Sequence, residues 1–253
     1  MGIFCFPVGD KVTSFNFTVW DSSFRLFTRF PERFIFDWQQ CRSRPYNPPV
    51  KSWLQIILIC FASGGLAQSL PLPPRATNAP DGDAFAQKIS SLDLKQREQM
   101  IETEILAGNV PDFLRKFCPV RVTEVTGGVT NVGVFFAAPD YLAVGSDQNY
   151  FLTPISPGTA QQVAQRLECV LPTRKMVDAI YAAAEVKLKP SPIPPSAAMT
   201  TVPIFAQHNA MVRAQRMSST NLFPLGALVA GHKKDVVISA RLADAPNKVA
   251  IYG

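Results

Sequence analysis

The only two histidines of the chain both lie among polar residues. His232 belongs to the polar segment Gly231-His232-Lys233-Lys234-Asp235, which lies between two apolar segments. A glycine beside a histidine allows a substrate to approach closely, and a neighbouring lysine can hold an anion or polarise a carbonyl group. We therefore expect His232 to act as a general base oriented by Asp235 or a distant carboxylate, with Lys233 binding substrate. The alternative is an ordinary basic hairpin turn.

A second group of polar residues lies on segments predicted as helices. His208 has Gln207 and Asn209 as neighbours, and we expect it either to support His232 and bind substrate with Asn209, or to hydrogen-bond a preceding loop. Arg174 and Asp178 are i,i+4 neighbours that could frame the edge of a sugar or carboxylate site. The alternative is that they simply pair with each other on the helix surface.

The motifs of common enzyme classes are missing from the sequence. There is no HExxH, GxSxG, P-loop or dinucleotide fingerprint, so we predict neither a metal site nor a cofactor. Cys118 and Cys169 are the only cysteines after residue 67. They are candidates for one disulfide, which would be favoured in an oxidising compartment, and the alternative is two separate thiols.

The charge of the chain does not indicate a nucleic-acid partner. The formal net charge is +6, but residues 68–253 hold eighteen Lys and Arg against fifteen Asp and Glu. These charges are interspersed, whereas nucleic-acid-binding proteins usually gather them on one face.

Residues 51–67 have the features of a cleavable secretory signal peptide. Lys51 is followed by a short apolar run, and small residues precede Gln68. The run is too short to cross a membrane, so no stable span is expected once the signal is cleaved. Residues 1–50 are then predicted to be a spurious or disordered extension, with translation starting at Val50. The alternative is a genuine extension followed by a signal anchor.

The remaining chain predicts a Pro/Ala-rich linker over 68–92 and a single α+β domain over 93–253. We expect an N-terminal helix capped by Asp93 and an antiparallel meander of about four strands between residues 120 and 152. Two helices should follow, over Ala160–Leu167 with Thr159 as its cap and after a cap at Thr173. A helix over Phe205–Met217 and short strands at 225–230, 236–239 and 249–252 complete the prediction.

Five stretches of this domain carry a resemblance to known proteins: residues 108–115, 140–147, 171–181, 207–209 and 231–237. From about Arg97 to the end, the chain resembles an uncharacterised family of secreted bacterial proteins with no assigned activity. In that family the chain continues beyond the equivalent of Gly253, so the resemblance implies a truncated C-terminus here. The alternative is a protein that ends on an edge strand.

These features predict two functions from different classes. The first is an extracytoplasmic hydrolase-like domain that acts on cell-wall or polysaccharide material through His232. The second is a non-catalytic secreted or envelope binding protein. Both imply a small-molecule or cell-envelope ligand, no nucleic acid, and a secreted or periplasmic location.

Overall fold

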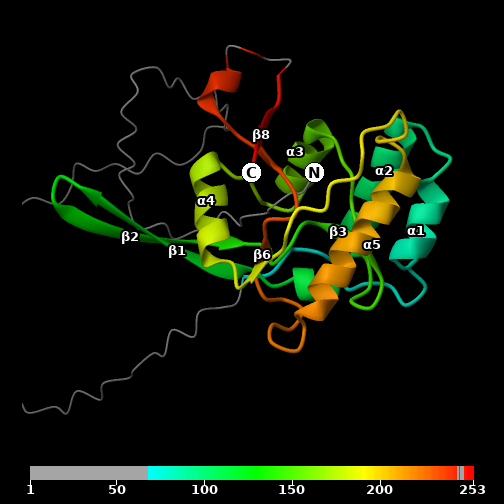
Figure 1. Cartoon of the computed structure of the whole chain (residues 1–253), viewed down its shortest axis with the longest axis horizontal. Coiled ribbons are helices and arrows are strands. Elements are labelled where there is room, and N and C mark those ends of the chain that lie inside the picture. Colours follow the sequence, from blue (N-terminus) through cyan, green and yellow to red (C-terminus); the bar gives the residue numbers. More distant parts are fainter. Residues whose placement is uncertain (1–67, 244, 246–247) are drawn as a thin grey trace, which may run out of the picture. The chain divides into compact units, whose positions relative to one another are not determined.

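The computed structural model describes residues 68–243, 245 and 248–253, and these form an α+β fold (Figure 1). The predicted extension over 1–50 and the predicted signal peptide over 51–67 lie outside the described residues. Within the described part, helices pack around several two-stranded sheets rather than on one large sheet. This agrees with the predicted fold class. None of the helices in that part combines the length and apolar character needed to cross a membrane.

The predicted linker over 68–92 is incorrect in its second half, because it contains helix α1 (Gly82–Ile89). Asp81 caps this helix by accepting a hydrogen bond from the backbone N–H of Ala84. Phe85 and Ile89 are one turn apart and fully buried, so they anchor the segment in the core. Helix α2 (Leu94–Leu106) follows, capped by Asp93 as predicted. The domain therefore includes residues that composition alone assigned to a linker.

The four strands predicted between residues 120 and 152 are present, but they form two hairpins rather than one continuous meander. After the short 3₁₀ turn η1 (Asp112–Leu114), strand β1 (Cys118–Thr126) pairs with β2 (Val129–Ala137) across Gly127-Gly128. Both glycines have positive φ, as a two-residue hairpin turn of the primed type requires. Strands β3 (Ala143–Gly145) and β4 (Tyr150–Leu152) form the second hairpin. Residues 138–142, between β2 and β3, are not in a strand, which separates the two sheets.

Helices α3 (Pro157–Arg166) and α4 (Arg174–Ala183) correspond to the next two predicted helices. The cap of α3 is Ser156, whose hydroxyl accepts from the N–H of Thr159, so the predicted cap at Thr159 is incorrect. Pro157 explains the difference, because proline is favoured in the first turn and lets the helix begin earlier. Helix α4 begins after Thr173, which caps it as predicted.

The last third of the described chain contains one long helix and two short sheets. Strand β5 (Val186–Lys187) runs parallel to β6 (Val229–Ala230), and α5 (Val202–Ser218) lies between them in the sequence. Strand β7 (Asp235–Val237) pairs with β8 (Ala250–Tyr252), and the 3₁₀ turn η2 (Ala240–Leu242) lies between those two. Helix α5 packs against α1 and β4. Figure 1 shows α5 and α1 on the same side of the domain. The turn from β6 to β7 carries the Gly231–Lys234 segment.

Candidate functional site

His232 lies in the tight turn between β6 and β7, and this turn requires a glycine at position 231. Gly231 has a φ of +98°, and a Cβ atom there would lie 2.5 Å from the backbone oxygen of Leu188. A side chain at this position would therefore clash with backbone and adopt a strained conformation. The turn directs His232 inward, where it is only 3% exposed. The alternative of an ordinary basic hairpin turn does not hold, because His232 is buried and β6 and β7 do not pair with each other.

The acidic group beside His232 is Asp140, which was not among the residues predicted from the sequence. Asp140 follows β2 and is 2% exposed. Its Oδ1 atom lies 3.3 Å from Nε2 of His232 and also accepts a hydrogen bond of 2.7 Å from the N–H of Tyr141. A backbone hydrogen bond from Val229 to Pro139, 2.7 Å long, holds this segment beside β6. A distant carboxylate, rather than Asp235, is therefore the group beside the imidazole.

Tyr141 connects the histidine to the rest of the turn. Its ring packs edge-on against the imidazole with centroids 4.8 Å apart, and its hydroxyl donates a 3.0 Å hydrogen bond to the backbone oxygen of Lys233. The Lys233 ammonium lies over the same ring, 5.7 Å from its centroid. We define the Asp140 cluster as Asp140, Tyr141, His232, Lys233 and Asp235.

Burial changes the protonation of two members of the cluster. It raises the pKa of Asp235 to about 7, an effect that the nearby Tyr141 hydroxyl partly opposes. Burial also lowers the pKa of Lys233 to about 8, and the nearby charge of Asp140 opposes that shift. Both groups therefore titrate within about one pH unit of neutrality, where proton transfer by side chains is most effective. Perturbed pKa values grouped in this way are typical of functional sites.

Three polar atoms of the cluster are buried without a hydrogen-bond partner among the described residues: both ring nitrogens of His232 and Oδ1 of Asp235. Burying such atoms unpaired costs about 1–3 kcal/mol each, so a fold usually keeps them only for a reason. The contact of His232 with Asp140 is close in distance, yet it is not a well-directed hydrogen bond. The two imidazole nitrogens are therefore not used by hydrogen bonds among the described residues.

The other predicted histidine lies near the cluster without bonding to it. His208, on α5, is partly buried, and burial together with the charges of Lys233 and His232 lowers its pKa. No hydrogen bond of the described residues joins His208 to His232. Both polar atoms of the Asn209 side-chain amide make hydrogen bonds to the backbone of β4. Its Oδ1 accepts from the N–H of Leu152, and its Nδ2 donates to the oxygen of Tyr150. The prediction that Asn209 binds substrate is wrong, because both ends of its amide hold α5 against β4.

Arg174 and Asp178 do not join the cluster. Both contact Tyr252 of β8: the Tyr252 hydroxyl donates to Asp178 Oδ1 over 2.8 Å, and Arg174 lies 5.7 Å from the ring centroid. They form no ion pair with each other among the described residues. The predicted substrate edge is therefore a contact between α4 and the last strand.

Cys118 and Cys169 are not joined by a disulfide. The Cys118 thiol donates to the backbone oxygen of Gly226 over 3.4 Å, and the Cys169 thiol donates to that of Leu167 over 3.1 Å. Of the two open alternatives, the structure has separate thiols. Burial and the nearby Glu185 raise the pKa of Cys118 to about 11, which keeps it protonated and a poor nucleophile at neutral pH.

Among the described residues, no three His, Cys, Asp or Glu side chains come together as a metal ion would require. The side chains of the Asp140 cluster are of types that can do acid–base chemistry and stabilise charge. Comparisons with known proteins found no matching family model, no similar curated protein and no similar solved structure. The resemblance to a family of secreted bacterial proteins accordingly stays a prediction, and the function has to be inferred from the geometry of the cluster.

Proposed function

We propose that the chain is an extracytoplasmic hydrolase-like domain in which His232 is the general base. The observation that carries this proposal is the 3.3 Å contact between Nε2 of His232 and Oδ1 of Asp140 inside a buried polar cluster. A carboxylate beside an imidazole orients the ring and stabilises the imidazolium that forms when the base takes a proton. The imidazole takes a proton from the attacking water and then returns it to the leaving group, so the base is regenerated in each turnover.

The roles of the two ring nitrogens follow from the contact. Nε2 faces Asp140, so Nδ1 is the nitrogen left to take a proton from water. Lys233 is partly exposed and remains mostly charged at pH 7 with its pKa of about 8, so it can stabilise negative charge that develops on a substrate oxygen. Because both ring nitrogens are buried, water and substrate reach Nδ1 only after the residues that cover it have moved.

The substrate class and location belong to the same proposal. The signal-like sequence at 51–67 supports export, and cell-wall or polysaccharide material would then be the substrate that an exported hydrolase meets. The location would be secreted or periplasmic.

The test is hydrolysis of peptidoglycan fragments, polysaccharides, and small esters and amides by the purified full chain. His232→Gln and Asp140→Asn should each lower kcat/KM about 100-fold or more, since a positioned general base contributes about that much. Lys234→Gln is the matched control, because Lys234 is exposed in the same turn and should behave as wild type. Far-UV circular dichroism and thermal unfolding confirm that each variant is folded. Unchanged hydrolysis in folded His232→Gln would exclude His232 as the base.

A non-catalytic secreted or envelope binding protein is the second candidate. One observation favours it: the His232 side chain is fully buried, so the imidazole is not in contact with solvent or a substrate in this conformation. In that case the wild-type chain would bind a substrate of the panel without cleaving it, and His232→Gln would alter stability rather than turnover. Failure of the wild type to cleave any member of the panel would favour this candidate over the hydrolase.

A further inference from the structure

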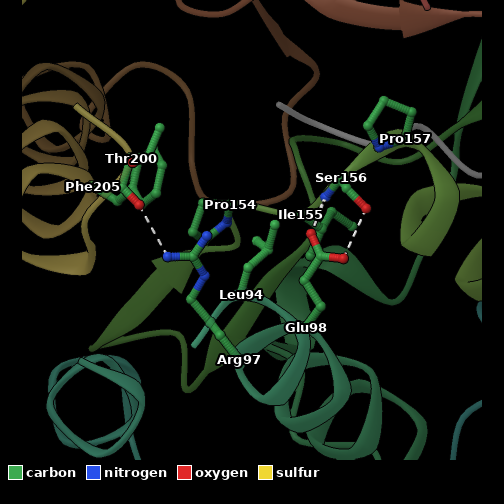
Figure 2. A pocket seen from close by; sticks show the side chains of 9 residues that line it. All are labelled: Leu94, Arg97, Glu98, Pro154, Ile155, Ser156, Pro157, Thr200 and Phe205. Atoms are coloured by element: carbon green, nitrogen blue, oxygen red, sulfur yellow. Dashed lines mark hydrogen bonds between the residues drawn. The ribbon is translucent and has the colours of Figure 1, made fainter. Parts of the chain in front are cut away.

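A pocket separate from the Asp140 cluster lies where the start of α2, the segment before α3 and the start of α5 meet (Figure 2). Its volume is about 610 Å³, which is within the range of pockets that hold small organic ligands. Much of its wall is apolar, with Leu94, Pro154, Ile155 and Phe205 contributing side chains. Such a wall favours a ligand with an apolar body.

Arg97 is the cationic residue of this pocket and is only 8% exposed. Its Nη1 donates to the backbone oxygen of Thr200 over 3.0 Å, and its guanidinium lies 5.6 Å from the centre of the Phe205 ring. These two contacts hold the guanidinium in place, as Figure 2 shows for the bond to Thr200. A buried arginine is nearly always paired with an anion or with several acceptors.

The opposite edge of this guanidinium has no partner among the described residues. Nε is buried without a hydrogen bond, and Nη2 makes none either. No carboxylate of the described chain forms an ion pair with Arg97. Nε and Nη2 together are the two-donor edge with which arginine binds a carboxylate through two parallel hydrogen bonds. The guanidinium therefore has two unused donors, of which Nε is buried, on the side best suited to an anion.

Glu98 lines the same pocket but does not supply the missing anion. Its carboxylate accepts three hydrogen bonds: 2.6 Å from the N–H of Ser156, 2.8 Å from the Ser156 hydroxyl and 2.6 Å from the Thr159 hydroxyl. Figure 2 shows it directed at Ser156, away from the guanidinium. Its charge lies at the N-terminus of α3, where the helix dipole stabilises it. An anion that enters the pocket therefore lies near a Glu98 carboxylate that is already stabilised by three hydrogen bonds.

We propose that this pocket binds an organic monocarboxylate with an apolar body. The carboxylate accepts hydrogen bonds from the Nε and Nη2 edge of Arg97, and the body packs against Ile155, Pro154 and Leu94. Inorganic phosphate would satisfy the charge but would leave the apolar walls uncovered, so it binds more weakly. This site does not depend on the hydrolase proposal, because none of its lining residues belongs to the Asp140 cluster.

The test is fluorine NMR of 4-(trifluoromethyl)benzoate titrated with the full chain, with 4-(trifluoromethyl)benzamide as the neutral comparator. We expect saturable binding of the benzoate and much weaker binding of the amide. Arg97→Met keeps an unbranched side chain that fills the space of the aliphatic stem and removes the charge, and it should weaken benzoate binding at least about tenfold. Arg166→Met is the matched control, because Arg166 lies on the surface of α3 in an ion pair with Glu102.

Leu94→Glu is a second variant that tests the pocket even if Arg97→Met does not fold. Leu94 is 57% exposed in the first turn of α2, so glutamate is tolerated there, and it places a carboxylate one turn before Arg97. This variant should also weaken benzoate binding, by competition or repulsion. Equal affinities for benzoate and benzamide, or unchanged benzoate binding in both folded pocket variants, would overturn the proposal. Absence of saturable binding in the wild type would overturn it as well.

Discussion

Replacing Asp235 by asparagine should stabilise the protein at neutral pH. Asp235 is buried in β7, and burial raises its pKa from 3.8 to about 7. Between these two values the folded state holds a proton that the unfolded state has released, so the free energy of unfolding falls as the pH rises from about 4 to 7. At 1.36 kcal/mol per pKa unit, the ionised carboxylate costs the fold about 4 kcal/mol at most. Asparagine resembles the protonated acid in shape and does not carry this cost.

The assay is urea unfolding, followed by far-UV circular dichroism at several pH values from 4 to 7.5. Wild type and Asp235→Asn should have similar stability near pH 4 and diverge as the pH rises, with the variant more stable by up to about 4 kcal/mol at pH 7.5. Titration of Lys233 does not interfere, because its lowered pKa of about 8 makes stability rise only above that window. Glu168→Gln, at an exposed side chain, is the control and should change little. A variant that is no more stable than wild type at pH 7.5 would refute the reasoning.

Two further predictions concern the packing of α1 and the turn at Gly231. Phe85→Ala should lower the free energy of unfolding by about 3–5 kcal/mol in the same urea assay, because Phe85 is fully buried in α1. A loss below about 1 kcal/mol would mean that the segment is a linker after all. Gly231→Ala should destabilise by more than about 1–2 kcal/mol, since it combines a left-handed φ with a clash against the Leu188 backbone. Thermal unfolding measures this, with exposed Gly127→Ala as a comparison that carries the φ strain without the clash.

Local features were predictable because they depend on residues close together in the chain. Asp93 and Thr173 cap their helices through hydrogen bonds to the N–H three positions ahead, as the sequence indicated. The glycine pair at 127–128 predicted the turn of the first hairpin, which is also a local feature because its two strands directly flank the turn. Helix α1 was missed because its proline-rich approach suggested a linker. The signal that could have found it was Asp81 as a cap, followed by Phe85 and Ile89 on one face.

The cluster itself was only half predictable. His232, Lys233 and Asp235 could be selected because they are adjacent in a polar segment between apolar ones. Asp140 could not be assigned as the partner of His232, because nothing in the local pattern after β2 specifies which distant strand lies beside it. Asn209 is an example of the opposite error, in which a residue was selected that the structure uses otherwise. It was predicted to bind substrate because it is polar and adjacent to His208, but its side chain joins α5 to β4. Residue type identifies candidates, while tertiary hydrogen bonds decide their roles.

The segment 139–141 explains why Asp140 is the residue whose substitution is most informative. Its neighbours dock it without using the Asp140 carboxylate: the oxygen of Pro139 accepts from Val229, and the hydroxyl of Tyr141 donates to Lys233. Asparagine at 140 also keeps an Oδ1 that can accept from the N–H of Tyr141, as the carboxylate does now. Asp140→Asn should therefore keep the position of the segment and remove only the negative charge beside His232. Loss of hydrolysis in this variant without loss of stability would then be attributable to that charge.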